Sequence, residues 1–338
     1  MSFVHNSWYC AGFADEIGEQ PIGRIFLDEP VMLYRREDGS VAALSDVCPH
    51  RFAPLHQGKR VGDVIACPYH GLQFDSHGQC VHNPHGSGRI PLRSSIKAYP
   101  VAERQGVVWI WMGDADQADP AKIVDLRLIG DESYPRVTGY MLMNVEYRLI
   151  IDNLLDLNHA PYLHSGTLSP VGATRETRAE RSADSAASHY LMRSVETPTS
   201  QRLGYDEPKG DFHISMEWKA PSNFVHGLAM TGEGRPPEEG SVTRGAHLLV
   251  PQTLTTTHYF WVMTRGSRPH DEQANAMLKQ IIQNAFLTED GPMMEACQRN
   301  MRGREFAALK PVFLETDAAP GHARAVLDKM IAAEAAAA

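Results

Sequence analysis

The stretch from Cys48 to His70 constrains the fold of this 338-residue chain more than any other. It contains Cys48-x-His50, then 16 residues, then Cys67-x-x-His70, and each pair begins with Cys-Pro. Thiolates and imidazoles in two tight clusters form a metal-site pattern, because two loops can approach one metal centre from opposite sides. We therefore expect the N-terminal part of the chain to fold around a metal.

The spacing within the pairs distinguishes between the metals that they can hold. Zinc ribbons favour two residues between the ligands of both pairs, whereas the first pair here has one. One intervening residue is the spacing of a Rieske [2Fe-2S] centre, in which two thiolates bind one iron and two imidazoles the other. The pattern favours this cluster, with zinc or coincidental core residues as the alternatives.

Composition sets the broad class. The chain is 43% hydrophobic and 22% charged, as in globular proteins, and its length predicts two or three domains. A net charge of -9 offers no basic field for nucleic acid. No run has the length of a membrane helix, and the start lacks the regions of a signal peptide, so we expect a cytoplasmic protein and no membrane contact. The cysteines outside the metal pairs, Cys10, Cys80 and Cys297, do not suggest a disulfide framework.

Residues 1–115 are predicted to form a small all-β domain. Short alternating strands flank turn-forming segments at Arg36–Ser40 and Ser76–Gly78, and the run 107–112 (VVWIWM) is a further strand. Gly71, directly after His70, permits a sharp backbone turn. The polar, acidic segment 113–125 is the expected boundary with a second domain, residues 116–338.

The second domain is predicted to combine strands with helices. Its expected elements are a strand at 140–150, a helix at 150–164, β runs at 186–265 and a helix at 271–304. The segment 232–240 (GEGRPPEEG) is expected to be a flexible polar loop. Together the two parts predict an α+β chain.

A second metal site is indicated at residues 153–164. Asp156 and His159 share a helix face, but His159 and His164 are five residues apart, about 140° around a regular helix. Pro161 lies between them, so we expect the helix to end or bulge there and to bring His164 beside His159. Two imidazoles and one carboxylate form the facial triad of non-heme iron. Alone, His-x4-His is a weak signal; beside the Cys/His pairs it is a strong one.

These motifs resemble the oxygenase components of Rieske non-heme iron oxygenases. Within that family the chain is similar to the vanillate O-demethylase, dicamba O-demethylase and toluenesulfonate methyl-monooxygenase group, over nearly its whole length. The matching segments are NSWYCAGF, CPHRFAPL, CPYHGLQFD, QCVHNPHG, DNLLDLNHAPYLH and FLTED. The resemblance implies a Rieske domain followed by a helix-grip catalytic domain, in which an antiparallel sheet packs against helices.

The same resemblance implies roles for individual residues. Cys48, His50, Cys67 and His70 match the cluster ligands. His159, His164 and Asp290 match the ligands of Fe(II), with Glu289 and then Glu295 as rivals for the carboxylate. Asp156 matches the acid that connects the two metal centres, and Asn153 matches an asparagine beside the iron.

For the substrate, His247 matches a position where a related enzyme places a histidine near the substrate carboxylate. His226 lies near a second polar contact, with Asn223 as the alternative. Three aromatic residues are candidates to stack on a substrate ring, with the hydrophobic core as their other expected location: Phe224, Phe260 and Trp261.

The resemblance also implies partners. The enzyme would take electrons from a separate NAD(P)H-dependent reductase or a ferredoxin, and use O2 to O-demethylate a methoxylated, vanillate-like aromatic acid with release of formaldehyde. Hydroxylation of an aryl methyl or ring carbon, and N-demethylation, are alternatives. In family folds the two centres of one subunit are too far apart for fast transfer. A head-to-tail homotrimer is therefore expected, with His70 of one subunit bonded to Asp156 of the next. A pure electron carrier and a zinc-stabilised binding module are the non-oxygenase alternatives.

Overall fold

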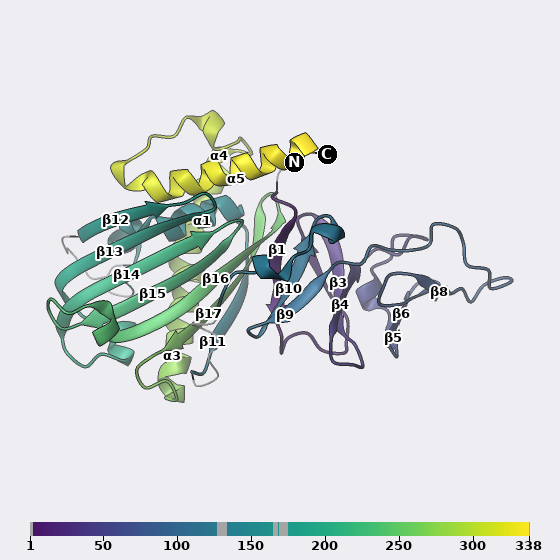
Figure 1. Ribbon diagram of the computed structural model, residues 1–338, viewed down its shortest axis with the longest axis horizontal. Coiled ribbons are helices and arrows are strands. Elements are labelled where there is room, and N and C mark those ends of the chain that lie inside the picture. The colour runs from purple at the N-terminus through teal and green to yellow at the C-terminus, as the bar shows by residue number, and fades with distance from the viewer. Residues whose placement is uncertain (1–2, 127–133, 165–167, 169–174, 338) are drawn as a thin grey trace. The chain divides into compact units, whose positions relative to one another are not determined.

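The structure, a computed structural model, describes residues 3–126, 134–164, 168 and 175–337. The chain forms two compact units (Figure 1). The first comprises His5–Ile123 together with the short segment Val250–Leu254. The second comprises most of the remaining chain, including Val124–Leu249.

The N-terminal unit is built from small antiparallel sheets, as the sequence predicts. They have the strand orders β1-β10-β9, β2-β3-β4 and β5-β6-β7-β8. Their bounds are β1 Ser7–Phe13, β2 Ile22–Phe26, β3 Glu29–Arg35, β4 Val41–Ser45, β5 Lys59–Val61, β6 Val64–Ala66, β7 Gln73–Phe74, β8 Cys80–His82, β9 Val101–Arg104 and β10 Val107–Met112. The predicted hairpin turns join β3 to β4 and β7 to β8.

The C-terminal unit is organised on a seven-stranded antiparallel sheet within the described residues, in the order β11-β17-β16-β15-β14-β13-β12. The strands are β11 Val137–Met143, β12 Arg175–Arg181, β13 Ser185–Glu196, β14 Lys209–Lys219, β15 Asn223–Thr231, β16 Ser241–Thr253 and β17 Thr256–Arg265. Burial alternates along β14, whereas residues 245–251 of β16 are buried without a break.

Helices pack against this sheet and against one another. They are α1 Tyr147–Leu155, α2 Ala160–Leu163, α3 Glu272–Asn284, α4 Gly291–Met301 and α5 Ala318–Ala337, with a π-helical turn, η7, at Ala285–Asp290. The C-terminal helix α5, yellow in Figure 1, contacts β12, β13 and α1, and α3 contacts β11. Short 3-10 turns are η1 Leu55–Gln57, η2 Ala115–Gln117, η3 Pro120–Lys122, η4 Leu157–His159, η5 Gln201–Leu203, η6 Pro237–Glu239, η8 Ala307–Leu309 and η9 Glu315–Asp317. This arrangement confirms the predicted α+β class.

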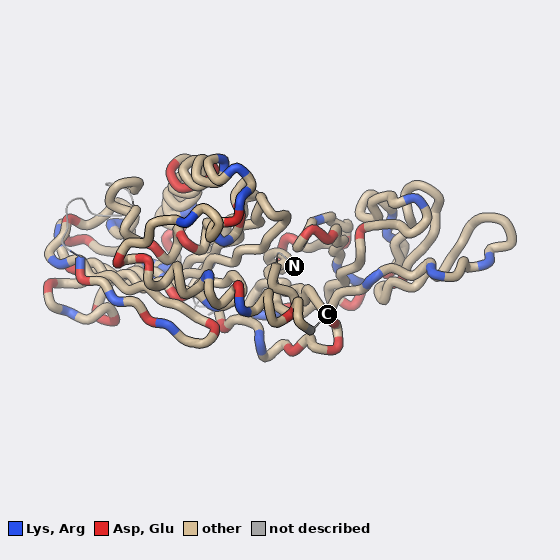
Figure 2. Tube along the Cα trace, turned by 90° about the horizontal axis from the view of Figure 1, so that it is seen from above, with Lys and Arg blue, Asp and Glu red and all other residues tan. Residues whose placement is uncertain are grey.

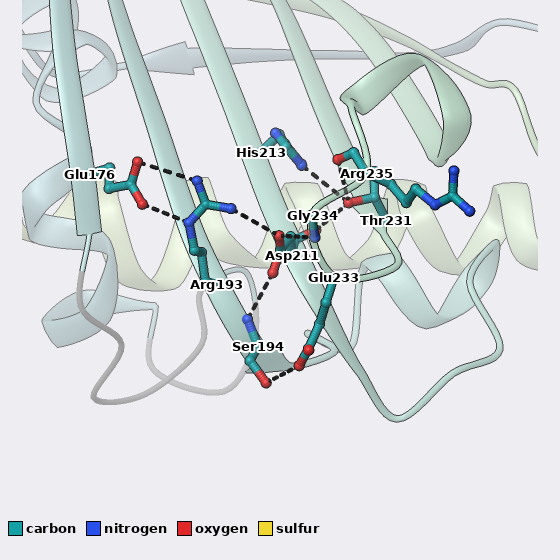
Figure 3. Close-up of polar contacts among 9 residues, drawn as sticks. All are labelled: Glu176, Arg193, Ser194, Asp211, His213, Thr231, Glu233, Gly234 and Arg235. Carbon is teal, nitrogen blue, oxygen red and sulfur yellow. Dashed lines mark hydrogen bonds and ion pairs between the residues drawn. The ribbon is translucent and has the colours of Figure 1, made fainter.

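The polar loop at residues 232–240 is anchored at its start by a buried carboxylate. Asp211 on β14 is 1% exposed and accepts hydrogen bonds from the backbone N–H groups of Ser194 and Gly234, both at 2.9 Å (Figure 3). Arg193, which also pairs with Glu176, lies 3.4 Å from the same carboxylate. Burial would raise the pKa of Asp211, but the backbone donors and Arg193 outweigh burial and lower its pKa. Asp211 therefore ties the irregular end of β13 to the loop after β15.

Charges are mixed along the surface. In Figure 2 acidic and basic residues alternate along the C-terminal unit instead of gathering in one region. The edge strand β12 is an example, with the sequence RETRAER. Charged side chains on an edge strand oppose pairing with a second sheet. No helix in the described part of the chain is long and apolar enough to cross a membrane.

Candidate metal centres and substrate cavity

The first candidate centre lies where two loops of the N-terminal unit meet. Cys48 and Cys67 belong to one buried cluster with core residues of β3, β4 and β6, and their sulfurs interact. His50 and His70 are adjacent, with ring centroids 4.5 Å apart. The loops are closed by backbone hydrogen bonds, and Gly71 adopts φ +72°, which a side chain would disfavour.

These four side chains fit an iron–sulfur cluster. Nδ1 of His70 is buried and lacks a hydrogen-bond partner among the described residues, as expected of an atom whose partner is a metal. Burial raises the pKa of Cys48 to about 11, so this thiol becomes a thiolate only when a cation takes the place of its proton. His85 contacts the main-chain oxygen of His70 through Nε2 at 2.8 Å, which braces the second loop.

The second candidate centre is in the C-terminal unit. His159, His164 and Asp290 offer ligand atoms that all lie within 4.8 Å of one another. Nε2 of His159 is 3.3 Å from Nε2 of His164. The Asp290 carboxylate is 3.5 Å from the first of these nitrogens and 3.1 Å from the second. The structure thus brings together the three residues predicted to bind Fe(II).

A break in the helix brings the two histidines together, but it does not lie where the sequence predicts it. Helix α1 ends at Leu155, and the Asp156 carboxylate caps η4 by accepting the Asn158 N–H at 3.0 Å. Pro161 lies in the first turn of α2, where its missing N–H costs no hydrogen bond. The expected end or bulge at Pro161 is therefore wrong in position, and the chain turns five residues earlier.

Asp290 belongs to a distant part of the sequence, and η7 places it beside the two histidines. This π-helical turn separates α3 from α4, and the Gly291 N–H donates to the Phe286 oxygen across five residues. A Cβ on Gly291 would lie 2.6 Å from that same oxygen, so a side chain there would force the backbone to shift. Wide turns of this kind are common at functional sites.

Each of the three residues has a second hydrogen-bond partner. His159 Nδ1 bonds to the main-chain oxygen of Asp156. Nδ1 of His164 is 2.6 Å from Glu289 Oε2, and Asn153 Nδ2 donates to Asp290 Oδ1 at 3.0 Å. Such outer contacts fix the orientation of metal ligands.

The electrostatics suit a divalent cation. Burial would lower the pKa of His164, but Asp290 and then Glu289 outweigh burial and raise its pKa. Two carboxylates within reach of a 4%-exposed imidazole leave uncompensated negative charge that a cation neutralises. Two imidazoles and one carboxylate are a ligand set typical of ferrous iron with open coordination positions.

Comparison with known proteins agrees with this geometry. Residues 7–100 match the Rieske [2Fe-2S] domain, and residues 143–333 match the vanillate O-demethylase oxygenase C-terminal domain. Dicamba O-demethylase, oxygenase component, of Stenotrophomonas maltophilia is 37% identical over 99% of this chain and 100% of its own length. The chain belongs to the vanillate O-demethylase oxygenase family.

Two further similarities extend the comparison. Chloroacetanilide N-alkylformylase, oxygenase component, of Rhizorhabdus wittichii is 34% identical over 98% of this chain and 97% of its own. A crystal structure of dicamba monooxygenase with non-heme iron and dicamba has a TM-score of 0.87 at 35% identity and covers both chains fully. The predicted family and enzyme class are confirmed, and the cofactors of this oxygenase are a [2Fe-2S] cluster and Fe(II).

A cavity of about 110 Å³ lies beside the His159, His164 and Asp290 group of the oxygenase. Most of its wall is apolar, with contributions from both the sheet and the helices, including Ile214, Met216, Leu228, Leu278, Ile282 and Phe286. None of the described residues that line it is a lysine or an arginine. Asn153 also lines this cavity, so the cavity and the metal site share a wall.

Two predicted substrate contacts reach this cavity together. His226 and His247 are stacked, with centroids 4.7 Å apart and planes 24° apart. Burial lowers the pKa of His226 to about 4, and burial and then His226 lower that of His247, so both rings are neutral at pH 7. Neither nitrogen of His226 has a hydrogen-bond partner within the described structure. Asn223, the alternative, begins β15 and does not line the cavity.

The three aromatic residues considered for stacking occupy the core. Phe224, Phe260 and Trp261 are fully buried, and none of them lines the cavity. Trp261 packs against Gly139, where a Cβ would lie 2.3 Å from its indole ring. Phe212 and Phe286 line the cavity instead.

The roles of two residues of the site were not predicted from the sequence. Tyr259 is fully buried and its hydroxyl lies 2.8 Å from His247 Nδ1, a contact between neighbouring strands. Glu289 was considered only as a rival ligand, whereas it bonds to the outer nitrogen of His164. Both contacts depend on which residues face each other in space, which spacing along the chain does not reveal.

Proposed function

We propose that this chain is the oxygenase component of a multicomponent monooxygenase that O-demethylates a methoxylated, vanillate-like aromatic acid and releases formaldehyde. The observation that carries the proposal is a small, mostly apolar cavity directly beside His159, His164 and Asp290. The name of the relative that is 37% identical, dicamba O-demethylase, supports the reaction type.

The chain would hold the metal centres as predicted from the sequence. His159, His164 and Asp290 would bind Fe(II) and leave open positions, and the bound iron supplies O2 activation. Cys48, His50, Cys67 and His70 would hold the cluster. We propose that the predicted domain of residues 1–115 accepts the electrons and that the predicted domain of residues 116–338 carries out catalysis.

The remaining residues would position the substrate and exclude water. The apolar wall holds the aromatic ring and keeps bulk water away from the metal site. Tyr259 would donate its hydroxyl proton to Nδ1 of His247, so that Nε2–H is free to donate to the substrate's polar group. His226 would supply a second donor beside it.

The reaction balances as a monooxygenation. One oxygen atom of O2 enters a methyl C–H bond, and the other leaves as water with two electrons and two protons. The hydroxylated methoxy group is a hemiacetal, which splits into formaldehyde and a phenol. The chain's contribution is to direct the methoxy carbon, and no other carbon, toward the metal.

A second candidate reaction is N-dealkylation or hydroxylation of an aryl methyl or ring carbon. The cavity lacks lysine and arginine among its described lining residues, so it also suits an uncharged substrate. The relative named chloroacetanilide N-alkylformylase supports this alternative.

Electrons would come from a separate reductase or ferredoxin in the cytoplasm, because the relatives are named as oxygenase components. We also propose a head-to-tail homotrimer in which His70 of one subunit bonds to Asp156 of the next. A depression of about 250 Å³ in the C-terminal unit is lined by Asp156 and His159. Its rim includes Val312 and Phe313, which are 86% and 61% exposed and would be covered by a neighbour.

The test is a screen of methoxylated and methylated aromatic compounds with a surrogate reductase and NADH. We expect formaldehyde and the matching phenol in equal amounts from at least one methoxylated acid. Hydroxylated or N-dealkylated product from another class, with no formaldehyde from any methoxy compound, would replace the leading proposal with the second.

A further inference from the structure

Two adjacent carboxylates contact opposite edges of the His164 imidazole. Asp290 Oδ2 is 3.1 Å from Nε2, and Glu289 Oε2 is 2.6 Å from Nδ1. The Glu289 side chain is 21% exposed, so most of it is shielded from water. His159 differs, because its Nδ1 bonds to an uncharged main-chain oxygen. His164 is therefore supported by a charged carboxylate, and His159 by an uncharged carbonyl oxygen.

The π-helical turn at Ala285–Asp290 presents both carboxylates to one ring. In a regular α-helix successive side chains point about 100° apart, so neighbours rarely serve the same small group. Here Asp290 faces the other two ligand residues, whereas Glu289 lies on the outer side of His164 and is not in the group of candidate ligand atoms.

We propose that Glu289 is a positioning residue of the iron site, which holds His164 with its proton on Nδ1 and its Nε2 lone pair toward the metal. The inference rests on the iron site of the proposed function. A carboxylate partner makes a metal-bound imidazole a stronger ligand than a carbonyl partner does, because it stabilises positive charge on the ring. His164 is then the stronger of the two histidine ligands.

The test compares Glu289→Ala and Glu289→Gln with the wild type, as full-length protein with its cluster in place. Glu295→Gln is the matched control, because Glu295 contacts Asn144 and Arg299. Fe(II) affinity is measured by competition with a ferrous chelator, and the ferrous nitric oxide complex is examined by electron paramagnetic resonance. We expect about 10- to 100-fold weaker Fe(II) binding and an altered spectrum for Glu289→Ala.

The Gln variant should lose less, because its amide oxygen still accepts from Nδ1, and the control should match the wild type. Wild-type affinity and spectrum in Glu289→Ala would overturn the proposal. So would loss of iron in Glu289→Ala together with its retention in Asp290→Ala, because Glu289 would then be the ligand. Circular dichroism and urea unfolding of the full-length protein report whether a variant has folded. If the Ala variant has not, the Gln variant provides the comparison.

Iron affinity is independent of any substrate. If no methoxylated aromatic compound is demethylated, the proposed function fails while the role of Glu289 is still measured. If demethylation occurs and Fe(II) affinity is unchanged in Glu289→Ala, only the role of Glu289 fails.

Discussion

Asp156 uses its main chain and its side chain for different purposes. The main-chain oxygen accepts from His159, while the carboxylate accepts from the backbone and the side chain of Asn158, both at 3.0 Å. The sequence places Asp156 and His159 on one helix face, and the resemblance implies that Asp156 connects the two metal centres. A substitution of the Asp156 side chain can therefore affect electron entry without removing the main-chain contact that supports the metal ligand His159.

We predict that Asp156→Asn retains both metals but forms product about 10- to 100-fold more slowly. The main-chain oxygen and the cap to Asn158 survive the change, whereas the negative charge that would receive His70 of a neighbour is lost. Iron content and single-turnover product formation with a pre-reduced cluster measure the two effects. Normal turnover in this variant would remove Asp156 from the electron path.

His226 gives the protein a specific dependence on acid. Its pKa is about 4 in the folded chain because of burial, and about 6.5 when unfolded. At pH values between about 4 and 6.5 the unfolded state binds more protons than the folded state. The free energy of unfolding therefore increases as the pH rises through this range and decreases as the pH falls. The slope for one histidine is at most about 1.4 kcal/mol per pH unit.

We predict that His226→Gln flattens this slope between pH 4.5 and 6.5. Urea unfolding of the iron-loaded protein at several pH values provides the measurement. His322→Gln is the control, since His322 lies on α5 and bonds to the Ser182 oxygen. Parallel stability curves for wild type and His226→Gln would show that burial does not change the pKa of His226 on folding.

At the scale of elements, local pattern predicts strands and helices better than it predicts their irregularities. Apolar spacing over residues 271–304 indicates one helix, but the chain forms α3, η7 and α4. A π-helical turn keeps the backbone helical and shifts the apolar face only slightly, so it leaves little trace in the sequence. Val250–Leu254 likewise groups with the N-terminal unit although all but its last residue belong to β16, because packing partners are set by distant residues.

Gly291 tests the importance of the π-helical turn. We predict that Gly291→Ala lowers the free energy of unfolding by about 1 to 3 kcal/mol and weakens Fe(II) binding, because the new methyl group would force the Phe286 oxygen away. Gly321→Ala is the matched control: it lies in α5 with its nearest neighbour at 3.9 Å. There alanine should be neutral or stabilise by up to about 1 kcal/mol. Unfolding curves and chelator competition distinguish the two; equal behaviour would show that the turn adapts freely.

At the scale of the whole molecule, the two metal centres lie in separate units of the chain. Motif spacing predicts the cysteine and histidine ligands because each pair is local in sequence, whereas Asp290 lies far along the chain and is assigned from the family resemblance. It does not predict the cavity, whose wall combines strands and helices from residues 153 to 290. The identity of the substrate depends on that wall. The sequence therefore predicts the type of reaction, but it does not predict the substrate.

The proposed trimer predicts that two inactive variants restore activity when they assemble together. Cys48→Ala removes cluster binding and Asp290→Ala removes iron binding, so each variant alone should be inactive. Each mixed trimer has one boundary at which an iron-competent subunit receives electrons from a cluster-competent neighbour, so the purified mixed rings should show about a third of wild-type activity. Co-expression with two affinity tags and purification of mixed oligomers provides the sample, and separately purified variants combined after assembly provide the control. Activity only in the co-expressed sample supports transfer between subunits. If co-expression yields mixed oligomers without activity, electrons pass within one chain and the ring is not part of the active site.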